Sequence, residues 1–127
     1  MTNSNYPIGD FLIRLKNISL TNRKSLEVNS SKLIKTTARL LQKEGYLEDV
    51  TETNGKLTLS LKFHKKNPIL VDVKLISKPG LRVYMGREDL AAIKGPSFFI
   101  ISTSKGLMTT REALKKGLGG EVIAEIL

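Results

Sequence analysis

The residues best suited to chemistry in this chain lie close together near its end. Three hydroxyls, an ammonium group and a glycine follow the apolar run 97–101 as Ser102, Thr103, Ser104, Lys105 and Gly106. Hydroxyls donate and accept hydrogen bonds, so three in a row can address base edges, ribose 2′-hydroxyls and phosphates. The lysine adds a positive charge, and the glycine permits close backbone approach. The cluster indicates a surface for an anionic partner; ordinary turn chemistry after a strand is the alternative.

A short helix is expected just after this cluster. Thr109 and Glu112 have the spacing of a capping box, which predicts a helix over 109–116 whose N–H groups add positive potential near the hydroxyls.

Catalytic readings of the same residues are weak. Ser102 and Lys105 match Ser-x-x-Lys, in which a lysine activates a serine nucleophile, but the partner motifs of such acyl-transfer enzymes are missing. The chain has no cysteine, and its one histidine, His64, lies in a polar turn without an acidic pair. The glycine-rich fingerprints of nucleotide binding are also absent. We therefore expect no enzyme activity, no cofactor and no metal.

The net charge of the chain indicates which class of partner it binds. The 127 residues include 21 Lys and Arg against 12 Asp and Glu, for a net charge of +9. Residues 1–64 hold 10 basic and 6 acidic side chains and residues 65–127 hold 11 and 6, so both halves are basic (+4 and +5). Such a field attracts polyanions, either nucleic acid or an acidic membrane face.

Location and domain number follow from composition and length. No apolar stretch approaches the roughly 20 residues that cross a bilayer, and MTNSNYPIGDF lacks the features of a signal peptide. A cytoplasmic protein is expected. The polar segment 64–68 ends in a proline and divides the chain into two predicted modules, 1–64 and 65–127.

The first module is predicted to be α-β-α-β-β. Five apolar residues from Ile8 to Ile18 recur at helical spacing, with Pro7 in the first turn. Ser30 or Ser31 caps a second helix, which ends near Gly45 and has Leu33 among its apolar residues. Strict alternation over 57–63 indicates a strand, and Asn54-Gly55 predicts a hairpin that joins it to 46–53.

The second module is predicted to be mostly strand. Alternation indicates strands over 71–75 and 81–85, the latter with Leu81, Val83 and Met85 on one face and Arg82 and Tyr84 together on the other. Pro79-Gly80 predicts a turn between them, 87–94 a brief helix, and 97–101 and 121–127 two further strands. The fold class is therefore α+β, as two small α/β modules.

Several of these segments together resemble one family. ISTSKGLMT, GLGGEV, KPGLRVY, PIGDFLIRLKN and NSSKLIKTTARLLQKEGYLEDV stand in the order and spacing of the eighth protein of the bacterial small ribosomal subunit. The resemblance covers nearly the whole chain, and STSKG followed by GLGGE is its most specific part. Two departures are visible: Tyr6 stands where the family usually has aspartate, and GPSFF replaces a glycine-rich approach to the strand.

This resemblance implies a function and partners. The family is a primary binder of small-subunit ribosomal RNA in the central domain, is needed for assembly, and is not an enzyme. Some members also repress translation of ribosomal-protein mRNA. The expected partners are small-subunit ribosomal RNA and neighbouring small-subunit ribosomal proteins, with no membrane, no cofactor and no homo-oligomer. The expected location is the ribosome in the cytoplasm, with an organellar ribosome as the alternative.

The resemblance also implies which residues touch RNA. The serine-threonine cluster would contact exposed bases and sugars, and Lys105 a phosphate. The remaining expected contacts in the second module are Gly106, Gly119, Gly120, Glu121, Tyr84, Arg82 and Lys78. Gly119 and Gly120 would leave room for the RNA backbone, while Glu121 would orient donors or accept from a base amine. A second RNA segment would meet Arg14, Lys16, Asn17, Ser30, Ser31 and Lys32, for which an ordinary solvated face is the alternative.

Overall fold

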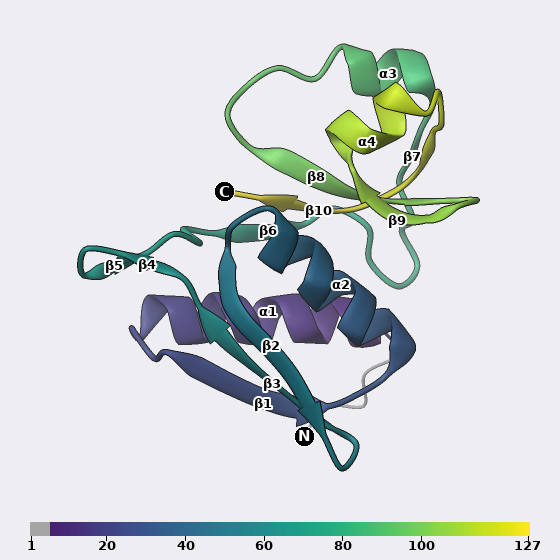
Figure 1. The fold of residues 1–127 in the computed structure, drawn as a ribbon. Helices are drawn as coiled ribbons and strands as arrows, with labels where there is room; N and C mark the ends of the chain where they lie inside the picture. Colours follow the sequence, from purple (N-terminus) through teal and green to yellow (C-terminus); the bar gives the residue numbers. More distant parts are fainter. Residues whose placement is uncertain (1–5) are drawn as a thin grey trace. The chain divides into compact units, whose positions relative to one another are not determined.

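A computed structural model describes residues 6–127 and confirms the α+β class. It contains helices and antiparallel sheets (Figure 1). The chain forms two compact units: one is Asp10–Val71, and the other joins residues 6–9 to Asp72–Leu127. We refer to them as the 10–71 unit and the 72–127 unit.

The first half of the chain has the predicted order α-β-α-β-β. Its elements are α1 (Pro7–Leu20), β1 (Ser25–Asn29), α2 (Lys32–Lys43), β2 (Leu47–Thr53) and β3 (Lys56–Leu61). The three strands form an antiparallel sheet in which β3 lies between β1 and β2 (Figure 1). A central β3 explains its strict alternation, since Leu57, Leu59 and Leu61 are all buried.

Both helices begin where the sequence predicts. Pro7 is the first residue of α1, and all five apolar residues of its stripe are buried. Ser31 caps α2 by accepting a hydrogen bond from the Ile34 backbone N–H at 3.2 Å, and Gly45 follows the helix with φ +90°. The placement of Leu33 was wrong: it is 41% exposed, because it lies in the first turn at the edge of the buried stripe.

The hairpin between β2 and β3 is also confirmed. Asn54 and Gly55 have φ of +53° and +76°, the left-handed pair of a type I′ turn. This turn matches the right-handed twist of the two strands, which is why a two-residue Asn-Gly connection suffices.

The polar segment after β3 belongs to the 10–71 unit. β4 (Phe63–His64) and β5 (Asn67–Pro68) form a small hairpin. The buried Ser19 hydroxyl then donates to the Leu70 carbonyl at 2.6 Å. With these contacts the unit extends to Val71, whereas the sequence predicts a module boundary after residue 64. Composition alone shows a polar, proline-containing stretch; it shows neither the β4–β5 pairing nor the contact between Ser19 and the distant Leu70.

The 72–127 unit is built on a five-stranded antiparallel sheet. Its elements are β6 (Val73–Leu75), β7 (Tyr84–Met85), α3 (Arg87–Ala91), β8 (Phe98–Thr103), β9 (Gly106–Thr109), α4 (Thr110–Lys115) and β10 (Gly120–Ile126). The order is β6-β10-β8-β9, and β7 also pairs with β10. β10 is therefore the central strand, and β6, β7 and β8 all pair with it.

Helices α3 and α4 supply the core of this unit. Leu90 of α3 and Ala113 of α4 are fully buried with Ile101, Met108 and Val122 of the sheet. Figure 1 shows the two helices together beside these strands. The capping box predicted for α4 is present: the Glu112 N–H donates to the Thr109 hydroxyl, and the Thr109 N–H to the Glu112 carboxylate.

Two expectations for this half were wrong. Residues 81–85 are not one strand: the strand is only Tyr84–Met85, and Leu81 is 63% exposed. Leu81 instead closes the predicted turn, in which Gly80 has φ +83° and Lys78 pairs with Leu81. In addition, β9 precedes α4 where a helix was expected directly, because four residues with little alternation give no strand signal.

A buried serine holds this turn in place. The Ser77 hydroxyl accepts a hydrogen bond from the Val83 N–H at 2.9 Å and lies 3.4 Å from the Val83 carbonyl, to which it donates. The side chain of Ser77 is fully buried. It therefore ties together the two ends of the segment that carries Lys78 and Arg82.

We predict that Ser77→Ala destabilises the protein by about 1–3 kcal/mol, because the part-buried Val83 N–H loses its partner. Urea unfolding followed by circular dichroism measures the change. Ser104→Ala, at an exposed serine, is the matched control and should stay within about 0.5 kcal/mol of wild type. Equal stabilities of the two variants would contradict the role of Ser77.

Candidate nucleic-acid interface

The hydroxyl cluster lies at the tip of the β8–β9 hairpin. Thr103 pairs with Gly106, so Ser104 and Lys105 form the exposed connection. The Thr103 hydroxyl donates to the Gly106 carbonyl at 2.9 Å and accepts from the Lys105 N–H at 3.1 Å. Gly106 takes φ +110°, a value that only glycine adopts readily. The connection is therefore fixed at its base, while the side chains of Ser104 and Lys105 point into solvent.

Thr103 differs in role from its neighbours. Its hydroxyl proton is engaged within the hairpin, so it can offer a ligand only a lone pair. Ser102, Ser104 and Lys105 make no side-chain hydrogen bond within the part of the chain that the structure describes, and remain available to a partner. The sequence alone does not distinguish the three hydroxyls, since their spacing carries no sign of the turn contact.

Strand register extends the cluster into a row. Glu121 of β10 lies opposite Ser102 of β8 on one side and opposite Tyr84 of β7 on the other. Residues directly opposite share a face of the sheet. The neighbouring positions Val122 and Ile101 face the core under α3 and α4, so the row occupies the other face. Tyr84 is 69% exposed and presents its ring there.

Arg82 joins the row through its charge. One guanidinium nitrogen of Arg82 donates to a Glu121 carboxylate oxygen at 3.2 Å, and its guanidinium carbon lies 4.6 Å from the centre of the Tyr6 ring. Burial and the nearby Glu121 carboxylate raise the pKa of Tyr6, and Arg82 partly opposes them. Tyr6 is the departure from the family pattern noted above, and here it is a platform for Arg82.

The two glycines have a different explanation from the expected one. A Cβ on Gly120 would lie 2.2 Å from the Ser102 carbonyl oxygen, and one on Gly119 would lie 2.6 Å from that of Met85. The protein itself fills the space beside them. Their lack of side chains lets β10 approach β8 and the end of β7, so room for an RNA backbone is not needed to explain them.

The six residues expected in the first module lie on separate elements. Arg14 and Asn17 are exposed on α1, and the Arg14 guanidinium lies 3.5 Å from the Glu27 carbonyl. Lys16 is half-buried on the same helix. The other three, at the start of α2, are Ser30, Ser31 and Lys32.

Both serines of this set, Ser30 and Ser31, also have structural roles. A hydrogen bond from Lys35, and a smaller contribution from one with Ser30, hold the pKa of the Glu52 carboxyl below its usual value. Ser31 is the cap of α2, and its hydroxyl can still donate while it accepts from Ile34. The structure therefore leaves fewer free groups here than in the 72–127 unit.

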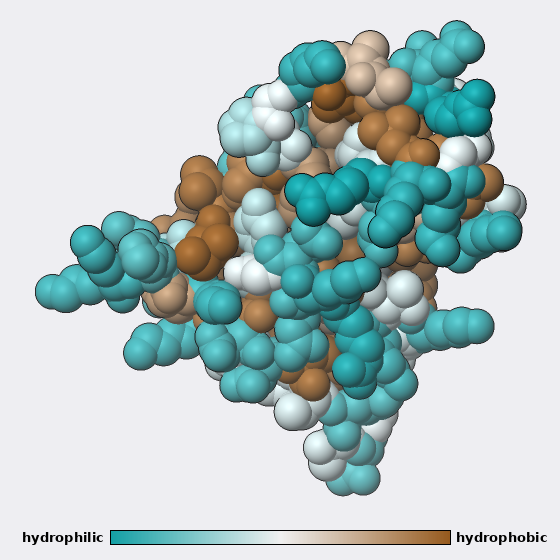
Figure 2. Space-filling view, turned by 45° about the horizontal axis from the view of Figure 1, so that its top comes forward, coloured by the Kyte–Doolittle hydropathy of each residue, from teal (hydrophilic) through white to brown (hydrophobic). Residues whose placement is uncertain are grey.

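Surface composition agrees with a polar partner. Hydrophilic residues cover much of the face in Figure 2, interrupted by smaller apolar areas. Within residues 6–127, the large apolar side chains that are exposed are Leu20, Leu33, Val71, Leu81 and Tyr84. Of these, Tyr84 belongs to the row and Leu81 to the adjacent turn.

Other chemistries find no support in the described residues. Residues 6–127 contain no group of three or more His, Cys, Asp or Glu that could hold a metal ion. None of the helices there is both long and apolar enough to span a membrane. Ser102 lies in a strand and Lys105 in a turn, so the Ser-x-x-Lys spacing does not bring them together on one helix face, where residues three apart meet.

Comparison with known proteins points in one direction. A family model described as ribosomal protein S8 matches residues 6–127. Small ribosomal subunit protein uS8 of Legionella pneumophila (strain Corby) is 46% identical over 125 residues, covering 94% of this chain and 97% of that protein. The protein of the same name from Teredinibacter turnerae is 40% identical over 124 residues, covering 94% and 95%. That from Acinetobacter baumannii is 42% identical over 122 residues, covering 92% and 93%.

We predict that Gly120→Ala destabilises the protein by at least about 1–3 kcal/mol, because the added methyl group forces the backbones of β10 and β8 apart. Gly86→Ala is the matched control, since the space beside Gly86 is open and its φ of −81° suits alanine. Thermal unfolding of both variants measures the effect. A Gly120→Ala protein as stable as the Gly86→Ala protein would disprove the close packing.

Proposed function

Because the chain belongs to the ribosomal protein S8 family, we propose that it binds small-subunit ribosomal RNA of the central domain and supports assembly of that subunit. The family is structural, and the chain is not an enzyme. The observation that carries the proposal is the row of Tyr84, Glu121 and Ser102, which continues into the exposed hairpin tip on the sheet face opposite the helices.

The chemistry of this row suits irregular RNA. Regular A-form helices hide base edges in a deep, narrow groove, so proteins read bases that bulges or loops expose. Ser102 and Ser104 would bond base edges or 2′-hydroxyls, and Lys105 would contact a phosphate. The Tyr84 ring is free to lie against a base or ribose. Glu121 holds Arg82 and can accept from a base amine with its remaining lone pairs.

Arg82 and Lys78 would contact phosphates beside the row. They lie at the two ends of the segment that Ser77 and the Gly80 turn hold in shape. Arg82 is already oriented by Glu121 and Tyr6, so less side-chain entropy is lost when it meets a phosphate.

In the 10–71 unit, we propose that a second RNA segment meets the α1 and α2 residues named above. Arg14, Asn17 and Lys32 are exposed and supply charge and amide groups. Ser31 would donate from its hydroxyl while it caps α2. Repression of ribosomal-protein mRNA, neighbouring ribosomal proteins as further partners, and a cytoplasmic ribosome as the location extend the same proposal.

A free RNA chaperone or a DNA-binding protein would share the charge and bind many sequences alike. Competition between a central-domain rRNA fragment and a random duplex at matched salt separates the alternatives. Our proposal requires preference for the fragment; equal affinities would rule it out.

We predict that Ser104→Ala weakens binding of the rRNA fragment by about 1–3 kcal/mol, because an RNA polar group is left desolvated without its partner. Binding of random RNA should hardly change, since a neutral hydroxyl contributes little to counterion release. Fluorescence anisotropy with both RNAs measures the difference. Wild-type affinity for the fragment would show that the cluster is turn chemistry alone.

We predict that Lys105→Ala lowers affinity for both RNAs and reduces the slope of log K against log salt by about 0.7–0.9, the value for one phosphate contact. Sequence preference should stay near wild type, because the ammonium reads charge. A salt titration measures the slope. An unchanged slope would place Lys105 away from phosphate.

A further inference from the structure

A basic pocket with an aromatic ring lies in the 10–71 unit, apart from every residue assigned to RNA above. Its volume is about 490 Å³. The residues that line it are Asn22, Lys24, Glu48, Leu61, Phe63, Lys65 and Lys66. Three lysines against one carboxylate give the pocket a net positive charge.

Backbone contacts hold the walls of the pocket in place. The Leu61 N–H donates to the Lys24 carbonyl at 2.8 Å, which fixes the entry to β1 beside β3. Phe63 pairs with Pro68 across the β4–β5 hairpin, whose turn is made by Lys65 with φ +60°. Asn22 also has a left-handed backbone, with φ +58°, just after α1. The walls of the pocket are thus held by backbone hydrogen bonds and turns.

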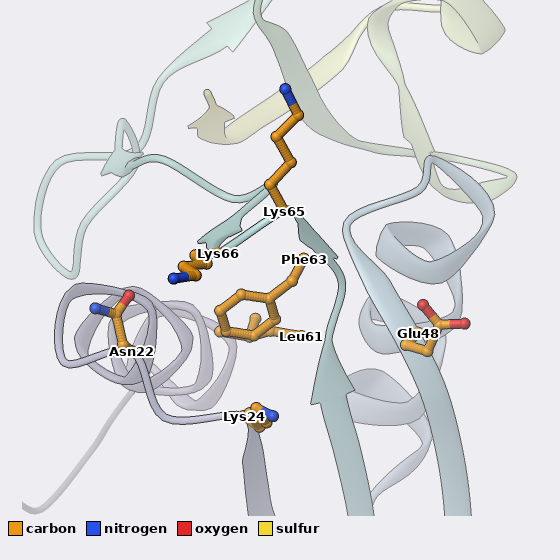
Figure 3. A pocket seen from close by; sticks show the side chains of 7 residues that line it. All are labelled: Asn22, Lys24, Glu48, Leu61, Phe63, Lys65 and Lys66. Carbon is orange, nitrogen blue, oxygen red and sulfur yellow. The ribbon is translucent and has the colours of Figure 1, made fainter.

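The aromatic ring of Phe63 lies between positively charged side chains (Figure 3). In Figure 3 the Phe63 ring lies between the end of α1 and strand β3, with Lys24 and Lys66 on two sides of it. Asn22 is nearby with its amide, while Lys65 points away from the ring and Glu48 lies apart on β2. Phe63 is half-buried, so part of the ring is accessible.

We propose that this pocket binds one unstacked nucleotide of single-stranded RNA. The Phe63 ring would stack on the base, the ammonium groups of Lys24 and Lys66 would contact the flanking phosphates, and the Asn22 amide would meet a base edge or the 2′-hydroxyl. The inference rests on the proposed function only in taking RNA as the ligand.

Size and chemistry favour this ligand over others. A volume of 490 Å³ admits a single nucleotide but not a duplex, so the site needs a base out of its stack. An acidic peptide would satisfy the lysines, yet it has no flat group to cover the ring between them unless it also carries an aromatic residue.

Cross-linking tests the location. A single-stranded RNA of about ten nucleotides containing 4-thiouridine is irradiated with the full-length protein, and mass spectrometry identifies the attached peptide. Attachment to the peptide that contains Phe63 supports the proposal. Attachment confined to the β8–β9 hairpin, or an acidic aromatic peptide that displaces the RNA at equal charge concentration, overturns it.

Charge variants test the mechanism with a matched control. The double variant Lys24→Gln/Lys66→Gln should reduce the slope of log K against log salt for the same RNA by about 1.4, at about 0.7 per phosphate on a single strand. Lys56→Gln/Lys62→Gln removes two exposed lysines of the same unit that do not line the pocket, and should leave the Phe63 cross-link intact. Equal loss of the Phe63 cross-link in both double variants would show a diffuse charge effect and overturn the proposal.

Phe63→Leu tests stacking. It keeps an apolar side chain and should lower affinity for single-stranded RNA about 5- to 150-fold, the range of one stacked base. Thermal unfolding checks that Phe63→Leu remains folded; if it does not, the lysine variants decide. Unchanged affinity of the folded variant overturns the stacking.

The same proteins separate this inference from the proposed function. Ser104→Ala should lower affinity for the rRNA fragment and leave the cross-link at Phe63 intact. The pocket variants should lose this cross-link but still bind the rRNA fragment in preference to the random duplex. If the Ser104→Ala result fails, only the role of the β8–β9 hairpin in RNA binding is contradicted. If the result for the pocket variants fails, only the nucleotide site at Phe63 is contradicted.

Discussion

The close approach of Gly120 to the Ser102 carbonyl is the constraint on which the 72–127 unit depends. β10 has β8 on one edge and β6 and β7 on the other, so its start must fit between two backbones at once. Any side chain at Gly120 would occupy the volume of that carbonyl. Because this fit is exact, Glu121 falls between Ser102 and Tyr84, and Val122 reaches the core beneath the helices. The same contact therefore sets both the packed face and the polar face of the sheet.

Three polar side chains fix the backbone beside the exposed groups that we assign to RNA binding. Ser77 holds the segment before β7, Thr103 closes the hairpin, and Ser31 starts α2. Each lies within a few residues of a group that we assign to RNA. Fixing the backbone beside such groups lowers the entropy they lose on binding, so a neutral hydroxyl such as that of Ser104 can contribute to recognition.

Much of the fold follows from local sequence, and the remainder depends on distant contacts. Helical spacing in α1, the Ser31 cap and the Asn54-Gly55 turn each involve neighbours along the chain, and all three were predictable. The serine-threonine cluster was found by residue type, but the separate role of Thr103 required the hairpin geometry. The packing role of Gly119 and Gly120 could not be predicted, because the atoms that fill their space belong to residues 18 or more positions earlier. The Phe63 pocket gave no signal, since Lys24 and Lys66 meet only when the chain is folded.

The position of β10 has a consequence for how the chain is made. The 10–71 unit is one continuous stretch of sequence, so it can fold while the remainder is still being synthesised. The other sheet cannot form until residues 120–126 have emerged, because its central strand is the last element of the chain. Until then β8 can pair with β9 but lacks its neighbour on the other edge. Loss of residues 120–126 would thus remove the middle of the sheet and leave β6, β7 and β8 each with an unpaired edge, whose exposed backbone groups promote aggregation.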